Sequence, residues 1–353
     1  MPDWTASMQQ TYEYYEVDPA TWEDRRKIDI VTSSSITRDV SSDTGGSASF
    51  NVSSDLGELY IRVYLITTQN RITEKFPLGT YLCQTTGDNF DGKVKDITLD
   101  AYAPLLELKE KNPPLGYSLG TNVNVMDAAT KIVSQNVRAP VVGAELVYTL
   151  DYPFVSELND TWYTFVSDLL SSVQYGLDVD ELGRVIFTPN QDANSLQPVW
   201  IYNDDNSSIL QPQFDVSRDL YGIPNVLEVV YTKEDGSYMY SKVVNNDPDS
   251  PISTVTRGRE VMQRITDPEL FSIPSQVQLD DYAKQTLRNL STLEYTLTYT
   301  HGYCPVRVGD CVLINYERAG LTNQRAKVIR QKIKCETGCQ VEETAVYTLS
   351  LWR

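Results

Sequence analysis

The stretch TWYTFVSDLLSSVQYGLDVDELGRVIFTP, residues 161–189, changes its hydrophobic period partway along. Its first part has the apolar spacing of one helix face, at Trp162, Phe165, Val166, Leu169, Leu170 and Val173. Asp160 stands where a helix cap is expected. Residues 175–180 and 184–189 then read as two strands around a turn at 181–183, which ends in a glycine. The order helix, strand, turn, strand predicts a small α/β module.

A second helix is expected upstream of this stretch. Apolar residues follow a helical stripe at Val125, Ala128, Ala129, Ile132 and Val133, with Asn124 as a candidate cap. Further upstream, residues 109–120 (KEKNPPLGYSLG) contain two prolines and two glycines and cannot form regular structure. We therefore place a domain boundary there and assign the α/β module to residues 106–200.

Residues 1–105 are predicted to contain about five strands. Residues 28–52 read as a hairpin with its turn at 43–46, where two glycines permit a tight turn. Runs rich in β-branched and aromatic residues follow at 60–66, at 76–82, which opens with a proline, and at 94–102. This spacing is typical of a small sandwich or barrel.

The last third, residues 201–353, is also expected to be rich in strands. Strands are predicted near 213–218, 226–232, 238–244, 311–316, 326–335 and 345–352. A helix at about 278–291 leads into an alternating strand at 293–299, and residues 245–259 read as an exposed connection. The fold class is thus a β-rich α+β protein, in which barrel or sandwich domains at 1–105 and 201–353 flank the α/β module.

The charge of the chain excludes some classes of function. Its 353 residues include 30 Lys and Arg against 48 Asp and Glu, which gives a net charge of −18. This argues against nucleic acid as a bound partner, because phosphate binding needs clustered cations. The single histidine, His301, leaves little for acid–base or metal chemistry. No apolar run is long enough for a membrane span, and the N-terminus has no signal-peptide pattern.

One motif suggests a hydrolase. Residues 116–120, GYSLG, match the G-x-S-x-G pattern that presents a nucleophilic serine between a strand and a helix. Two prolines precede the motif, however, and the chain offers only His301 as the base. We therefore expect an ordinary glycine-rich loop and no enzyme activity.

Four of the five cysteines lie near the C-terminus, at Cys304, Cys311, Cys335 and Cys339. Four thiolates could hold a tetrahedral zinc ion or form two disulfides. The spacing does not match a zinc knuckle, and disulfides are disfavoured in a reducing cytoplasm. Unpaired structural thiols are the preferred interpretation, with a metal site and disulfides as open alternatives.

The other groups of charged residues are interpreted as parts of turns or of structural contacts rather than as binding sites. Carboxylates are paired at Asp88 and Asp91, Asp178 and Asp180, and Asp204 and Asp205. None fits a calcium loop, and all are interpreted as turn residues. Arg257 and Arg259 form a compact basic cluster, for which we expect an acidic neighbour. No catalytic, cofactor-binding or metal residue is predicted, and no cofactor.

Several segments, taken in order, resemble the tail or baseplate hub proteins of tailed bacteriophages and related contractile injection machines. They are SSSITRD (33–39), YIRVYLI (60–66), FPLGTYL (76–82), the helix and hairpin at 161–189, and the helix, long strand and V-G-D turn at 282–321. The resemblance covers essentially the whole chain. It rests on the order of modules rather than on one sharp motif.

The resemblance implies a homotrimer in which each subunit supplies two tail-tube-like barrels, at 1–105 and 201–353. Three subunits would then present six similar faces and join a hexameric tail tube to a trimeric central spike or fibre. The implied partners are the tail tube or distal tail protein, the spike or tail fibre protein, the tape measure protein and other baseplate proteins. The protein would be a virion component, assembled in the host cytoplasm.

An acidic lumen would let DNA pass without sticking, so DNA is expected only in transit. A carbohydrate- or receptor-binding virion protein is the alternative, because the chain is rich in Tyr and Trp. An enzyme acting on cell-wall polymer would need a carboxylate pair in a cleft, and the sequence does not single out such a pair.

Overall fold

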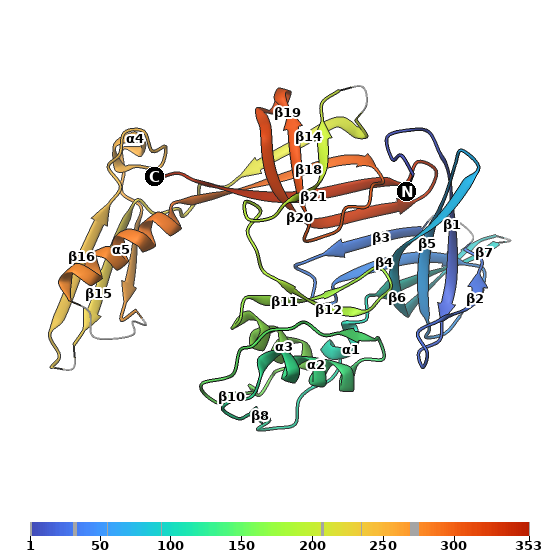
Figure 1. Cartoon of the computed structure of the whole chain (residues 1–353), viewed down its shortest axis with the longest axis horizontal. Coiled ribbons are helices and arrows are strands. Elements are labelled where there is room, and N and C mark those ends of the chain that lie inside the picture. Colours follow the sequence, from blue (N-terminus) through green and yellow to red (C-terminus); the bar gives the residue numbers. More distant parts are fainter. Residues whose placement is uncertain are drawn as a thin grey trace. The chain divides into compact units, whose positions relative to one another are not determined.

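The computed structural model describes residues 2–30, 34–54, 56–92, 94–205, 208–233, 235–268 and 275–352. The chain forms two compact units (Figure 1). The first unit comprises Met1–Phe214 and Thr298–Ala345, and the second comprises Asp215–Leu297 and Val346–Arg353. Strands predominate in both units, as the predicted β-rich α+β class requires. Among the helices described, none is long and apolar enough to cross a membrane.

The first unit begins with a block of antiparallel strands. They are β1 (Gln9–Val17), β2 (Asp24–Ile28), β3 (Ser34–Asp39), β4 (Gly46–Val52), β5 (Tyr60–Gln69), β6 (Ile72–Asp91) and β7 (Val94–Tyr102). Their order in the sheet is β3-β4-β7-β6-β5-β1-β2. The hairpin predicted at 28–52 is confirmed as β3 and β4. The predicted number of strands was too low, because the polar sequences of β1 and β2 conceal the alternation.

Pro77 does not open a strand as expected. β6 begins at Ile72 and runs through the proline, and its register against β5 shifts between Val63 and Tyr64. An irregularity of this kind accommodates a residue that has no N–H to donate.

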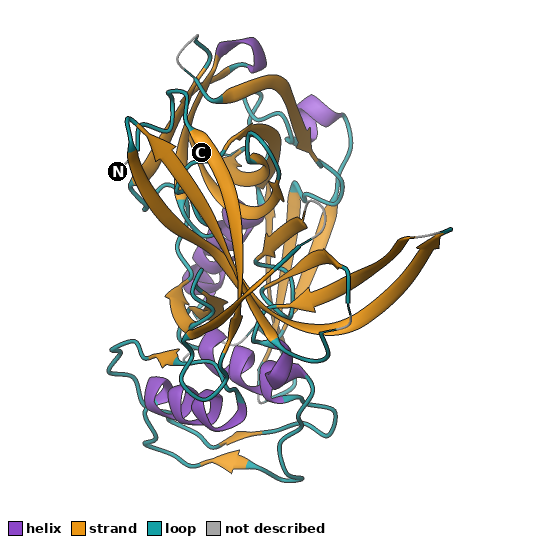
Figure 2. Cartoon of the chain, turned by 90° about the vertical axis from the view of Figure 1, so that its right-hand side faces the viewer, coloured by secondary structure: helices purple, strands orange, loops and turns teal. Residues whose placement is uncertain are grey.

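Along the sequence, the α/β module follows the first strand block and precedes a second one, which is described below. Its helices, grouped together in Figures 1 and 2, are α1 (Leu106–Lys109), α2 (Val125–Asn136) and α3 (Trp162–Ser171). Its strands are β8 (Ser118–Leu119), β9 (Val141–Val142), β10 (Phe154–Val155), β11 (Tyr175–Val179) and β12 (Val185–Pro189). β12 pairs with β11 antiparallel and with β9 parallel. The apolar stripes predicted for both longer helices are buried in one shared core, and the hairpin predicted at 175–189 is confirmed.

The two helix caps differ in how well they were predicted. The side chain of Asn124 accepts a hydrogen bond from the Asp127 N–H at 3.0 Å, so the predicted cap of α2 is confirmed. The cap predicted for α3 was wrong by one residue. Thr161 caps this helix, because its Oγ1 accepts the Thr164 N–H at 3.2 Å while Thr164 Oγ1 accepts the Thr161 N–H at 2.9 Å.

A second strand block completes the first unit and extends into the second. It contains β13 (Pro198–Asn203), β14 (Leu210–Arg218), β18 (Thr292–Gly302), β19 (Cys311–Tyr316), β20 (Leu321–Cys335) and β21 (Gln340–Ser350), with the 3₁₀ turn η1 (Glu317–Ala319). Their order is β14-β18-β21-β20, and β19 joins β20 to β13. β20 also pairs antiparallel with β3, so both strand blocks form one sheet. Within the described residues, no sheet closes into a barrel.

The second unit has a core of its own. A three-stranded sheet of β15 (Val226–Thr232), β16 (Tyr238–Val244) and β17 (Met262–Thr266) packs against α5 (Gln276–Leu290). The exposed connection predicted at 245–259 is confirmed only in part, because some of its residues are buried. Asn245 and Ser253 are completely buried there, and the short helix α4 (Thr254–Arg257) follows. Asn245 donates to the Ser250 hydroxyl at 2.9 Å, so polar side chains fold this segment onto itself.

Candidate functional site: a buried polar junction

The turn between β11 and β12 is fixed by its own side chains. Asp180 Oδ1 accepts the N–H groups of Leu182 at 3.0 Å and of Arg184 at 2.8 Å. Gly183 has a φ of +75°, and a Cβ atom on it would lie 2.5 Å from Thr80 Cβ of β6. This turn therefore lies directly against the first strand block, and glycine is required both by its backbone conformation and by the lack of space.

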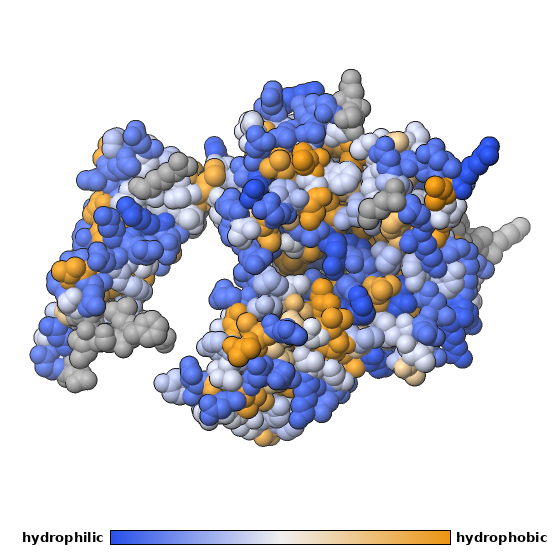
Figure 3. Space-filling view, in the orientation of Figure 1, coloured by the Kyte–Doolittle hydropathy of each residue, from blue (hydrophilic) through white to orange (hydrophobic). Residues whose placement is uncertain are grey.

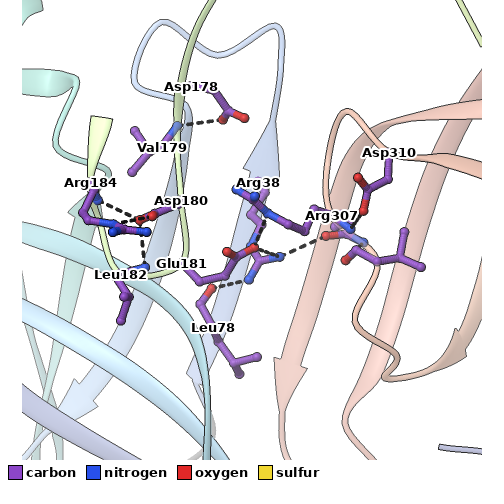
Figure 4. Close-up of polar contacts among 12 residues, drawn as sticks. Arg38, Leu78, Asp178, Val179, Asp180, Glu181, Leu182, Arg184, Arg307 and Asp310 are labelled. Atoms are coloured by element: carbon purple, nitrogen blue, oxygen red, sulfur yellow. Dashed lines mark hydrogen bonds and ion pairs between the residues drawn. The ribbon is translucent and has the colours of Figure 1, made fainter. Parts of the chain in front are cut away.

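Glu181, at the tip of the turn, lies between two arginines (Figure 4). Its Oε1 is 2.7 Å from Arg307 Nε and 3.4 Å from Arg38 Nη1. Arg38 is on β3 in the first strand block, and Arg307 precedes β19 in the second. Burial alone would raise the pKa of Glu181, but the charges of both arginines outweigh it and lower the pKa. One ionised carboxylate thus links the module to both strand blocks.

The Leu182 carbonyl anchors the other side of the turn. It accepts hydrogen bonds from Trp22 Nε1 at 2.8 Å and from Arg62 Nη2 at 3.0 Å. Arg62 also donates to Thr80 Oγ1 at 3.0 Å and pairs with Asp24 at 2.9 Å. These donors all belong to the first strand block, so the turn is bonded to it through backbone as well as through side chains.

Arg38 extends the junction into a longer network. It donates to the Leu78 carbonyl at 2.5 Å and to Gln331 Oε1 at 3.2 Å. Gln331 Nε2 in turn donates to Glu343 Oε2 at 2.7 Å. Gln331 and Glu343 are buried on β20 and β21. A continuous chain of polar contacts therefore runs from the module turn into the second strand block.

The network ends in a buried pair, His301 and Glu343, both without exposed surface. Nε2 of His301 lies 3.4 Å from Glu343 Oε2 and 3.1 Å from the Tyr202 hydroxyl, while Tyr299 donates to Glu343 Oε1 at 2.5 Å. Burial would lower the pKa of His301, but Glu343 and Cys304 raise it to about 10. Glu343 has a lowered pKa because His301 outweighs its burial. The pair is therefore charged at neutral pH.

This arrangement is suited to fixing the positions of the module and the two strand blocks rather than to catalysing a reaction. The charged groups of the network are compensated by partners inside the protein. A small cavity of about 30 Å³ lies beside Arg38, Glu181 and Arg307, which is room enough for water. A satisfied buried network of this kind makes the relative placement of its elements unique.

The residues of the G-x-S-x-G motif are not brought together with a base. Ser118 is exposed on β8, where it pairs with Val155 of β10. His301 is completely buried against Glu343 and Tyr202. The serine therefore has no histidine to activate it.

The cysteines are all buried free thiols. Cys304 lies 3.3 Å from the Tyr202 hydroxyl, and Cys311 contacts the Ala193 carbonyl at 3.4 Å. Burial raises the pKa of Cys335 to about 12 and that of Cys339 to about 11, so both thiols are protonated at neutral pH. In the part of the chain that the structure describes, no group of three or more potential ligands could hold a metal ion.

The paired carboxylates have different surroundings. Asp178 and Asp180 flank the β11–β12 turn, and Asp180 bonds the turn backbone as predicted. Asp204 forms an ion pair with Arg318 at 3.0 Å. The side chains of Asp88 and Asp91 lie outside the described residues.

The expectation of an acidic neighbour for the basic cluster was wrong for Arg257. Its guanidinium donates to the backbone carbonyls of Ile223 at 2.8 Å and Leu220 at 3.2 Å. Arg257 is thus a structural residue, because it satisfies carbonyl groups of a loop in its own unit.

Sequence reasoning found the turn at 181–183 but not the network around it. Arg38, Gln331 and Glu343 stand among other polar residues in their strands, and in the sequence they read as solvent-facing residues. The available signal was the period of the strand, because Glu343 is in phase with Val341 and Ala345, which are buried.

Comparisons with known proteins find similarity to solved structures but not to any known sequence family. No family model and no curated protein matches the sequence. A tail protein from Neisseria meningitidis MC58 is similar in fold, with a TM-score of 0.63 and 14% identity over 95% of this chain and 96% of that one. The 43 kDa tail protein of prophage MuSo2 from Shewanella oneidensis has a TM-score of 0.64 and 12% identity over 96% and 98%.

A Francisella PdpA–VgrG complex contains a third similar chain. Its TM-score is 0.56 and its identity 9%, and the match covers 98% of this chain but 58% of that one. At these identities the likeness concerns the fold. It extends over nearly the whole of this chain and includes both strand blocks and the module.

Proposed function

We propose that this chain, which has the fold of prophage tail proteins, is a structural hub of a phage tail or baseplate. Three copies would form a ring that joins the hexameric tail tube to a trimeric spike or fibre. The predicted domains at 1–105, 106–200 and 201–353 are part of this proposal, with the strand blocks as two tube-like domains. The chain would have no enzyme activity and would act through its shape.

The observation that carries the proposal is the edge-to-edge pairing of β3 with β20. It places two strand-rich blocks side by side in one polypeptide, so three chains would present six blocks to a sixfold tube. The polar junction at Glu181 supports this, because it bonds the module to both blocks at once. An adaptor under mechanical load needs its parts fixed in this way.

The charge of the chain supports a DNA channel. Each copy carries a net charge of −18, so a ring of three would carry three times that. Because DNA is held by cationic contacts, an acidic lumen would favour sliding over binding. The remaining proposed partners are the tail tube or distal tail protein, the spike or fibre, the tape measure protein and other baseplate proteins. The site of action would be the virion, after assembly in the host cytoplasm.

Electron cryomicroscopy of purified tails would test this proposal. We expect three copies of the chain in a ring at the end of the tail tube, with one strand block of each copy beside the next. A ring of six copies, or a copy on the outside of the tail without contact to the channel, would contradict it. The second result would favour a receptor-binding protein instead.

A further inference from the structure

Two of the buried thiols lie at the turn that joins β20 to β21. Cys335 is the last residue of β20, and Cys339 comes four residues later, directly before β21. The N–H of Cys339 donates to the Glu336 carbonyl at 2.9 Å and closes the turn. Cys335 is 4% exposed and Cys339 has no exposed surface, so both lie beneath the molecular surface that Figure 3 displays from one side.

The two thiols face the same pair of tyrosines. Tyr12 and Tyr14 stand two residues apart on β1, so their side chains lie on one face of that strand. Burial raises the pKa of both tyrosines, and Cys335 and Cys339 each raise the pKa further because they lie close to both hydroxyls. The Tyr12 hydroxyl also donates to the Glu336 carbonyl at 2.9 Å, within the turn itself. Both sulfur atoms are therefore gathered in one place in the core.

Cys339 occupies a backbone position where cysteine is unusual. Its φ is +39°, and the φ of Gly338 before it is +94°. Such a conformation favours glycine, because a Cβ atom is crowded by the neighbouring backbone. Strain that a protein retains at one residue points to a role for that side chain.

The spacing of the two cysteines suits a disulfide. Such a bond joins residues whose Cα atoms lie about 4.4–6.8 Å apart. The ends of a β-turn lie less than about 7 Å apart, and the hydrogen bond between Cys339 and Glu336 makes these residues the ends of one. Cys335 adjoins Glu336, and its thiol faces the same tyrosines as that of Cys339. A bond between the two sulfurs therefore needs little movement of the backbone.

We propose that Cys335 and Cys339 are a redox pair, which closes to a disulfide when the protein meets a disulfide oxidant such as oxidised glutathione. The thiolate of Cys339 attacks one sulfur of the oxidant, whose disulfide bond breaks and releases one glutathione. The thiolate of Cys335 then attacks the Cys339 sulfur, and the second glutathione leaves. The two cysteines together lose two electrons and two protons, which the two released glutathione thiols carry away.

The disulfide would secure the turn at the end of the pairing between β3 and β20, which joins the two strand blocks. Cys335 pairs with Ser34 at the last position of that register. A reducing cytoplasm keeps the pair as thiols, whereas a virion released from the cell meets oxidising surroundings. This setting rests on the proposed function, but the chemistry of the pair does not.

Mass spectrometry after alkylation of free thiols would test the pair. The purified chain is incubated with excess oxidised glutathione, with and without urea below its unfolding transition, because urea opens turns locally and gives the oxidant access. Trypsin cleaves after Lys334, and the peptide that follows holds Cys335 and Cys339 and no other cysteine. In the untreated protein this peptide should carry two alkyl groups.

After oxidation, most copies of this peptide should carry no alkyl group and should have lost two hydrogen atoms. The free thiols of the protein should fall from five to three. The internal disulfide should exceed the glutathione adduct by about tenfold or more, because the second thiol is held beside the first.

Cys83→Ser is the matched control, because it removes a buried thiol on β6 and leaves the pair in place. Its peptide should oxidise as in the wild type, whereas Cys339→Ser should form no internal disulfide. A treated wild-type peptide that keeps both alkyl groups even in urea, or carries only glutathione, or is joined to Cys304, would overturn the redox pair. Each of these results leaves the hub function standing. A chain absent from the end of the tail tube in purified tails would overturn the hub function and leave the pair.

Discussion

Glu181 and Gly183 lie in one turn but hold it in different ways. Glu181 supplies a charge that two arginines compensate, at 2.7 Å and 3.4 Å. Gly183 has no side chain, and a larger residue would not fit because Thr80 occupies the space where its Cβ atom would lie. At the scale of the residue, therefore, the contact between the module and the first strand block depends on one charge and one missing Cβ atom, besides the hydrogen bonds to the Leu182 carbonyl.

Gly183→Ala should destabilise the protein by about 3 kcal/mol, since it combines an unfavourable φ with a clash against Thr80. Gly116→Ala is a matched control with the same φ of +75° and no atom within 4 Å of the new Cβ. It should cost only about 1 kcal/mol. Urea unfolding of both variants would measure the difference, and equal losses would mean that Thr80 does not confine the turn.

The pair of His301 and Glu343 predicts a pH dependence of stability. The pKa of His301 is raised from its ordinary 6.5 to about 10, so the folded protein binds a proton that the unfolded chain releases. The stabilisation is fully present below pH 6.5 and is lost as the pH rises through about 10, with a slope of about 1.4 kcal/mol per pH unit for one proton. Denaturant unfolding between pH 7 and 10 would measure this loss.

The double variant His301→Gln/Glu343→Gln is the control for this measurement. It removes both titrating groups from the same buried place and keeps polar side chains there. The fall in stability between pH 7 and 10 should become smaller in this variant. An unchanged slope would show that other groups cause it.

Helix α3 shows what sets an element boundary. The sequence analysis placed the cap at Asp160, whereas the structure places it one residue later, at Thr161. In the structure, Thr161 and Thr164 bond each other's backbone N–H groups, while Asp160 accepts the Glu157 N–H. The path of the loop that enters the helix decided between the two residues.

Thr161→Ala should destabilise the first unit by about 1 kcal/mol, because it removes the hydroxyl that accepts the Thr164 N–H. Thr161→Ser keeps that hydroxyl and should change the stability by a few tenths of a kcal/mol. Chemical denaturation of both variants would test this. Equal losses would assign the effect to the lost methyl group instead of the cap.

At the scale of the whole molecule, each compact unit has its own apolar core. Leu169 is fully buried in the module core of the first unit, and Leu287 is fully buried beneath the sheet of the second. Separate cores of this kind support separate cooperative unfolding.

Leu287→Ala and Leu169→Ala form a matched pair, each expected to cost about 2–5 kcal/mol. Calorimetry of the wild-type protein should show two transitions. Each variant should lower the midpoint of one transition and leave the other in place. A single transition that both variants lower alike would show that the units unfold together.

The sequence by itself determined the local elements. The stripes of α2 and α3 and the hairpin of β11 and β12 follow from side chains close together in the chain, where spacing alone fixes which face is apolar. The β-rich class could also be predicted, and the comparisons confirm the tail-protein resemblance at the level of the fold.

Only the tertiary structure decided the rest. The pairing of β3 with β20 and the ion pairs of Glu181 with Arg38 and Arg307 join residues far apart in the chain. Sequence spacing carries no information about such contacts, because any exposed carboxylate could meet any arginine. His301 reads as an isolated residue in the sequence and becomes half of a buried charged pair because two distant strands place Glu343 beside it.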